Sequence, residues 1–234
     1  MLEKVFSSEA LREAWEILVE EFPLAIWETF YVTVLSTLFA IAIGLPLGVL
    51  LVTGSKNGVM PLPKWLMATI NVIINLLRSV PFLILMILLI PLTRLIMGNP
   101  VGAAPSIIPL TVAAFPFVAR LVEGSLRELN PGIIEAAQSM GARPMQIVMK
   151  VMIPESVPSL ISNATIAVTT ILGYSAMSGA LGGGGLGRIA INYGYYRYKY
   201  LVMLLAVVLL ILMVQLFQEL GTRWAIKADK RLKK

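Results

Sequence analysis

Long stretches without a charged residue constrain the fold of this chain more than any other feature of its sequence. Three intervals between consecutive charges hold 27, 32 and 19 residues, and they lie between Glu28 and Lys56, between Glu155 and Arg188, and between Lys199 and Glu219. A helix needs about 20 residues to cross a hydrocarbon core of roughly 30 Å, and a charge at mid-bilayer is costly. Each interval therefore predicts one transmembrane helix.

Two further spans are predicted in the middle of the chain. Residues 65–93 are mainly apolar but are interrupted by Arg78 and Pro81, so we expect one long, kinked span there. Residues 104–126 supply the next. With 58% apolar and 14% charged residues and a mean hydropathy of +0.84, the chain is too apolar for a soluble domain. The predicted fold is an all-α polytopic membrane protein with five transmembrane helices.

The distribution of charge predicts the orientation in the membrane. The N-terminal 28 residues hold 7 of the 13 acidic residues, whereas 6 of the 19 Lys and Arg lie in the last dozen residues. Positively charged flanks stay in the cytoplasm, so we expect an external N-terminus and a basic cytoplasmic tail over residues 223–234. A basic juxtamembrane tail is typical of contact with membrane lipid, and no nucleic acid partner is expected.

Several chemistries are excluded by composition. The chain has no Cys and no His, so it offers no thiolate or imidazole metal site, no Cys nucleophile and no Ser-His triad. It has no G-x-x-x-x-G-K-[ST] loop to hold nucleotide phosphates. We therefore expect a protein that is not an enzyme, with no catalytic, metal or cofactor-binding residue of its own. The G-x-G-x-x-G of Gly182, Gly184 and Gly187 has no acidic residue about 20 positions on, and it predicts a tight turn and a close helix contact.

Residues 1–26 predict an external amphipathic helix. Ser8 can cap it, and Leu11, Trp15, Leu18 and Phe22 recur at helical spacing. An anchor in the membrane interface and a docking site for an external partner are both open.

The loop over residues 130–154 contains residues that typically start and end helices, and their spacing predicts two short helices. Asn130 can cap the first with Pro131 at its opening position, and Gly141 can supply the left-handed residue that ends it. Pro144 can start the second, which we expect to stop before Pro154.

Two polar faces are predicted inside the membrane. Asn71, Asn75 and Arg78 share one helix face, which either lines a path for a zwitterionic solute or hydrogen-bonds to neighbouring helices. Tyr174, Ser175 and Met177 follow Gly173 in the fourth span, where Met177 either gates the path or packs against other side chains. Gly44 and Gly48, with Pro46 between them, predict a local helix contact.

The loop resembles the EAA loop of permease subunits in binding-protein-dependent ABC importers. Glu135, Ala136, Ala137 and Gly141 match at full spacing, with Val151 and Ile153 as conservative replacements near its end. Together with further runs the resemblance covers about residues 27–222, and these runs look like those of the methionine-import permeases within the family. These runs are Asn75–Phe82, Ile108–Thr111, Pro116–Arg120, Gly173–Met177 and Gly182–Gly187.

The resemblance implies a type I ABC importer permease fold and alternating access for methionine, in its L form and, as an open alternative, its D form. It implies a coupling loop whose residues contact an ATPase: Glu135, Ala136, Ala137, Gly141, Ala142 and Pro144. It also implies a homodimer in the bacterial cytoplasmic membrane, two copies of an ABC ATPase that bind ATP and Mg, and an external binding protein or lipoprotein.

Other functions remain open. A permease of the same family for another small amino acid or solute fits the same motifs. A secondary transporter or channel would need an ion or proton relay, yet no Asp, Glu or His falls inside the second, fourth or fifth span. A membrane scaffold would not require polar helical faces.

Overall fold

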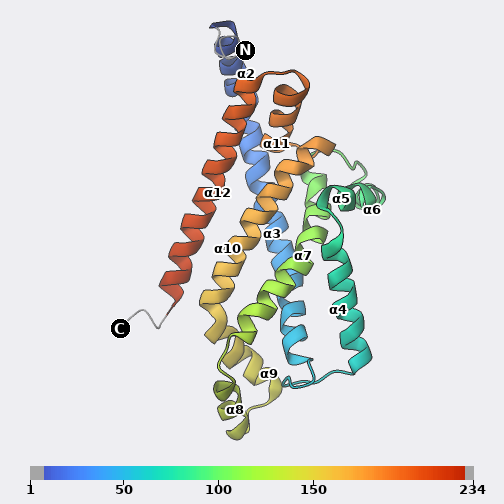
Figure 1. Ribbon diagram of the computed structural model, residues 1–234, viewed down its shortest axis with the longest axis vertical. Coiled ribbons are helices and arrows are strands. Elements are labelled where there is room, and N and C mark those ends of the chain that lie inside the picture. Colours follow the sequence, from blue (N-terminus) through green and yellow to red (C-terminus); the bar gives the residue numbers. More distant parts are fainter. Residues whose placement is uncertain (1–7, 230–234) are drawn as a thin grey trace. The chain divides into compact units, whose positions relative to one another are not determined.

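The regular structure of the described part of the chain, residues 8–229 in a computed structural model, is helical throughout (Figure 1). The α-helices are α2 (Ser8–Glu20), α3 (Phe22–Thr53), α4 (Lys64–Ser79), α5 (Phe82–Leu88), α6 (Ile90–Met97), α7 (Ala103–Arg127), α8 (Pro131–Ser139), α9 (Pro144–Ile147), α10 (Ile153–Ser178), α11 (Gly185–Ile189) and α12 (Tyr200–Ala228). Two π-helical turns, Val148–Met152 and Ala190–Tyr196, and a 3₁₀ turn, Gly179–Leu181, join some of them. Of the predicted basic tail, Arg223 and Lys227 lie in α12, and the other four basic residues lie outside the described part.

Four helical stretches are long and apolar enough to cross a membrane, and they are Phe22–Thr53, Ala103–Arg127, Pro144–Leu181 and Tyr200–Ala228. The pair α4 and α5 passes the same test only together, bent by 105° at its break. Five spans result if that pair counts as one, which agrees with the predicted fold.

Over residues 65–93, where one long, kinked span is predicted, the chain forms the three separate helices α4, α5 and α6. Val80 is extended at φ −78° and ψ 125°, as the ring of Pro81 demands of the residue before it. A second break falls at Leu89, with φ −88° and ψ 0°. Proline at the start of α5 thus ends α4 completely instead of bending it.

The chain divides into two compact units. The first comprises the described residues of 1–37 with 81–111 and 168–217, and the second comprises 38–80, 112–167 and the described residues of 218–234. Each of the four long helices contributes residues to both units.

The core of the first unit joins α2, the start of α3, α11 and the start of α12. Its buried members are Ala14, Phe22, Ala25, Leu186, Ile189, Val202 and Ala206. Leu18 packs against this cluster, but Trp15 is 66% exposed and Leu11 is 50% exposed. Of the predicted apolar face, Leu18 and Phe22 therefore pack inside the unit, whereas Leu11 and Trp15 stay exposed.

The second unit packs α3, α4 and α7 around Leu51, Ile74 and Ala119. The predicted local contact at Gly44 and Gly48 is confirmed. A Cβ atom at Gly48 would lie 2.5 Å from the Cβ of Val122, closer than atoms can approach. The two glycines therefore let α3 and α7 touch along their backbones.

Candidate functional site

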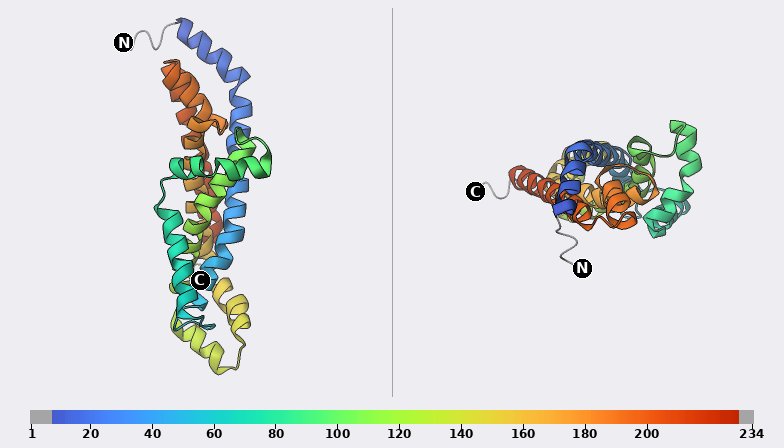
Figure 2. Two further views of the ribbon diagram at one scale, coloured as in Figure 1. Left: turned by 90° about the vertical axis from the view of Figure 1, so that its right-hand side faces the viewer. Right: turned by 90° about the horizontal axis from the view of Figure 1, so that it is seen from above.

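The first helix of the predicted coupling loop forms as its sequence indicates. The side-chain oxygen of Asn130 accepts a hydrogen bond from the backbone N–H of Gly132 at 2.9 Å, and Pro131 occupies the first turn of α8. Both residues satisfy or remove backbone donors that a helix start leaves free. The loop residues form a helical hairpin that projects beyond α7 and α10 within the second unit (Figure 2).

The turn after α8 depends on Gly141, whose φ is +78° as predicted. It lets the N–H of Ala142 reach the carbonyl of Ala137 at 3.1 Å, which closes the helix end. A Cβ atom at Gly141 would meet nothing within 4 Å, so the need for glycine is conformational. α9 then begins at Pro144, where the Gln146 side chain accepts from the N–H of Arg143 at 2.8 Å.

The second short helix does not stop before Pro154, so that expectation is wrong. The helical stretch continues from Pro144 to Leu181, through the π-helical turn Val148–Met152 into α10. The N–H of Ile153 bonds to the carbonyl of Val148, five residues back. Pro154 falls in the first turn of α10, directly after this wider turn, where its missing N–H does not break the helix.

The predicted coupling residues lie mostly at the surface. Glu135, Ala136, Gly141 and Pro144 are exposed and Ala142 is half-buried, whereas Ala137 is buried. No described residue forms an ion pair with Glu135. Its side chain also borders a cavity of about 530 Å³, which is lined in part by the end of α3 and by the loop that follows it. The carboxylate of Glu135 is thus exposed and has no ion-pair partner within residues 8–229.

This hairpin also has an apolar surface that was not predicted from the sequence. Met140, Met145 and Met149 are 81%, 59% and 58% exposed, and Ile133 on the same hairpin is exposed as well. Flexible methionines on a surface adapt to the shape of a partner. The presence of several methionines in a loop bounded by helix caps could have predicted this apolar surface.

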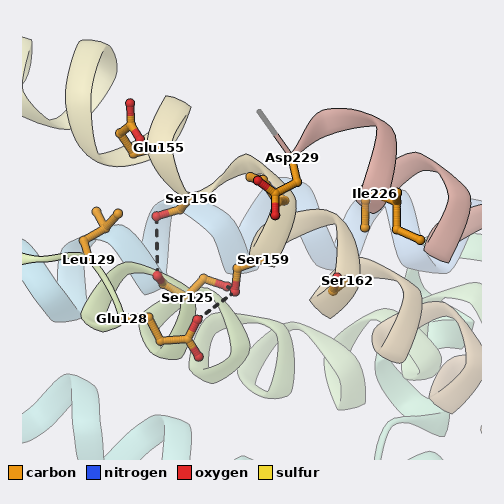
Figure 3. Close-up of a pocket in the computed structure, with 11 residues that line it drawn as sticks. Ser125, Glu128, Leu129, Glu155, Ser156, Ser159, Ser162, Ile226 and Asp229 are labelled. Atoms are coloured by element: carbon orange, nitrogen blue, oxygen red, sulfur yellow. Dashed lines mark hydrogen bonds between the residues drawn. The ribbon is translucent and has the colours of Figure 1, made fainter. Parts of the chain in front are cut away.

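A polar pocket of about 330 Å³ lies where α7, α10 and α12 approach one another in the second unit (Figure 3). Four serines and three carboxylates line it, and they are Ser125, Ser156, Ser159, Ser162, Glu128, Glu155 and Asp229. Within residues 8–229, no three carboxylates are grouped closely enough to hold a metal ion.

The hydrogen bonds of this pocket join the two ends of the loop. The hydroxyls of Ser125 and Ser159 are 3.0 Å apart, and Ser159 also donates to Glu128 at 3.1 Å. Ser156 donates to the backbone carbonyl of Ser125 at 3.4 Å. α7 and α10 are therefore fixed to each other at the base of the hairpin.

Two residues of the predicted polar face, Asn71 and Asn75, serve as acceptors for one arginine of α7. Arg120 donates to their side-chain oxygens at 2.8 and 2.9 Å and to Glu123 at 2.6 Å. Glu123 also accepts from Arg127 at 2.9 Å. The bonds from Arg120 to Asn71 and Asn75 join α7 to α4, which is one of the two readings left open for this face.

The remaining predicted path residues differ in their environments. In the second unit Arg78 is exposed. In the first unit Tyr174 stacks on Phe82 with ring centroids 4.8 Å apart, Ser175 is buried and Met177 is 50% exposed. A Cβ atom at Gly173 would meet nothing within 4 Å. The helix face from Gly173 to Met177 is therefore open in this chain.

The glycine run forms a tight turn against α3, as predicted. Gly182, Gly184 and Gly185 have φ values of +82°, +75° and +68°. The N–H of Gly185 donates to the carboxylate of Glu28 at 2.7 Å, and that of Leu186 donates to Thr29 at 2.9 Å. Glu28 thus anchors this turn, a role that its position at a span end did not predict.

Comparison with known proteins places this geometry among transport proteins. A family model described as binding-protein-dependent transport system inner membrane component matches residues 44–226. A Vibrio cholerae protein named probable D-methionine transport system permease protein MetI is 46% identical over 88% of this chain and 92% of its own length. The D-methionine transport system permease protein MetI of Escherichia coli K12 is 48% identical over 66% of this chain and 70% of its own.

Solved structures agree in fold. A chain from the inward-facing MetNI methionine ABC transporter, in its native CY5 crystal form, has a TM-score of 0.89 and 45% identity, covering 92% of this chain and 99% of that one. A chain of an amino acid ABC transporter has a TM-score of 0.72 at 18% identity, over 94% and 98% of the two chains. The second likeness concerns the fold alone.

Proposed function

The chain belongs to the family of binding-protein-dependent transport system inner membrane components, and from this membership we propose that it is the permease subunit of an ATP-driven importer of methionine. The observation that supports methionine as the substrate is the 46% identity, over 88% of the chain, to a relative named for D-methionine transport. Both enantiomers are candidate substrates.

We propose that the partners are two copies of an ABC ATPase, a second copy of this chain and an external binding protein or lipoprotein. The exposed hairpin supports the proposal of an ATPase partner, because Glu135 offers a charge and the methionines offer an adaptable apolar surface. Five spans are few to enclose a path, which favours a homodimer with the path on its two-fold axis. ATP and Mg belong to the ATPase.

The residues of the coupling hairpin and of the path keep their proposed roles. The residues proposed to contact the ATPase are Glu135, Ala136, Gly141, Ala142 and Pro144. Ala137 is buried and packs beneath this surface. The path or its gate is assigned to Asn71, Asn75, Arg78, Tyr174, Ser175 and Met177. Alternating access would move these faces between inward and outward states.

The proposed arrangement in the inner membrane has the N-terminus outside and the C-terminus in the cytoplasm. The excess of acidic residues before residue 29 and of basic residues after Glu219 supports it. The proposed organisation is an external segment over residues 1–26, whose described part contains α2 and the start of α3, the transport domain over 27–222 with its coupling loop at 130–154, and the basic tail over 223–234.

Uptake measurements test the function. The chain is expressed with its ATPase and binding protein in cells that lack their own methionine importer, and uptake of labelled L- and D-methionine is measured. ATP-dependent uptake of either enantiomer, abolished by an ATPase variant that cannot hydrolyse ATP, is expected. No methionine uptake, together with uptake of another amino acid, would assign a different solute.

A further inference from the structure

A small polar cavity of about 120 Å³ lies in the first unit, apart from the sites described above. It is several times larger than the roughly 30 Å³ that one water molecule occupies. Its lining comes from the junction of α2 and α3, from α11 and from the chain leading to α12, and consists of Glu21, Arg188, Ile189, Asn192, Tyr193 and Arg197.

The two arginines of this cavity lack an acidic partner in the described part of the chain. No carboxylate among residues 8–229 forms an ion pair with Arg188 or Arg197, whereas nearby Lys199 is paired with Glu13 at 3.2 Å. The Nε atom of Arg188 is buried with no hydrogen-bond partner. Because a buried donor without an acceptor is costly, an acceptor from outside the chain is expected.

The single carboxylate of the cavity bonds to another lining residue and not to an arginine. Glu21 accepts a hydrogen bond from the hydroxyl of Tyr193, and this bond, more than burial, raises the pKa of Tyr193 above its ordinary value of 10.0. The guanidinium of Arg197 lies over the Tyr193 ring, 4.7 Å from its centroid. The cavity therefore has an excess of positive charge and suits an anion.

The position of the cavity along the chain places it at a membrane surface. Glu21 directly precedes α3, and Arg197 lies three residues before α12, both of which are candidate spans. Exposed tyrosines surround the second of these starts, and they are Tyr195, Tyr196, Tyr198 and Tyr200. Aromatic belts of this kind mark the headgroup level of a bilayer, where the abundant anion is the phosphate of phospholipids.

We propose that this cavity binds the phosphate group of a membrane phospholipid through Arg188 and Arg197. The guanidinium fork donates paired hydrogen bonds that match phosphate oxygens, and the Asn192 amide adds a neutral donor. Such a lipid would fix the start of α12 against the α2–α3 junction. The proposal does not depend on which solute is transported.

Lipid retention tests this proposal. The protein is purified in its native assembly from membranes, and bound phospholipid is measured by native mass spectrometry. The double variant R188Q/R197Q is expected to retain several-fold less phospholipid than the wild type. The matched control R12Q, which removes an exposed arginine paired with Glu16 in the same unit, should retain the wild-type amount.

A second measurement separates lipid from free phosphate. Phospholipid added back to the delipidated wild-type protein should raise its thermal midpoint, and the rise should be lost in the double variant. An equal rise with inorganic phosphate alone would overturn the assignment to lipid. Wild-type lipid retention in an assembled double variant would overturn the site itself. If the double variant does not assemble, lipid retention is measured on the single variant R197Q, whose position is exposed. Undiminished phospholipid retention in R197Q would also overturn the proposed site.

Discussion

The side-chain amide of Asn163 donates to the hydroxyl of Ser125 at 2.7 Å and to the backbone carbonyl of Leu121 at 3.1 Å. This pair joins α10 to α7 about two turns from the coupling hairpin, and Ser159 joins them again beside it. If the hairpin moves, α7 and α10 would therefore move with it, and the chain would not bend where the hairpin joins these two helices.

Replacing Asn163 by Leu is expected to weaken the coupling of hairpin movement to movement of α7 and α10. The change removes two hydrogen bonds, each worth about 1 kcal/mol, so thermal stability should fall moderately. Methionine uptake per ATP hydrolysed should fall while the ATPase still binds. Ser162→Ala, at an exposed neighbouring position, is the control. A wild-type ratio of uptake to hydrolysis in Asn163→Leu would contradict this role.

Glu135→Arg and Gly141→Asp are both expected to leave a folded permease that holds the ATPase weakly. The first inverts a charge that has no ion-pair partner among residues 8–229. The second strains a position at φ +78° by about 1 kcal/mol. Co-purification of the ATPase reports the result, with Glu135→Gln and Gly141→Asn as milder controls. Unchanged assembly and uptake in both variants would refute the assignment.

Arg120→Gln should destabilise the protein more than the loss of a surface charge. Arg120 and Glu123 have side chains that are only 22% and 14% exposed, and hydrogen bonds to charged groups are worth about 1.5–3 kcal/mol. The control, Arg223→Gln, breaks an exposed pair worth about 0–1 kcal/mol. Equal thermal midpoints for the two variants would show that the Arg120 contacts contribute little.

Cysteine labelling tests the orientation without background, because the chain has no cysteine. Cysteines are introduced in place of Ser7 and Lys233, two positions outside the described residues. In intact cells an impermeant thiol reagent should label the first and spare the second until the membrane is broken. The reverse pattern would mean an inverted topology.

Met177→Ala separates a gate from a packing residue. Met177 is 50% exposed in the single chain, so truncation should cost little folding stability. A gate residue should give faster basal ATP hydrolysis or solute leak in the assembled transporter. Tight coupling together with a lowered thermal midpoint would assign it to packing.

The coupling hairpin could be predicted from the sequence because its determinants are local. Asn130, Pro131 and Gly141 act on backbone groups within a few residues of themselves, so their effects follow from spacing alone. Apolar intervals located the long helices for the same reason. At Pro81 the local signal was present, but a break was taken for a kink.

Contacts between distant residues could not be predicted in this way. For Asn71 and Asn75 two readings stayed open, because nothing in their own helix showed that Arg120, over 40 positions away, would donate to both. The pairing of Glu28 with Gly185 spans 157 residues. The packed face of α2 likewise depends on which residues of α11 and α12 meet Ala14.

The π-helical turn Val148–Met152 changes how side chains are counted across this part of the chain. Each residue of an α-helix advances about 100° around the axis, and a π turn inserts one extra residue without ending the helix. A helical wheel drawn continuously from Pro144 into α10 is therefore out of phase by about 100° beyond Ile153. Deleting one residue within 148–152 would restore the regular phase and rotate the part of the hairpin that precedes the deletion, including Met145, around the axis of α10.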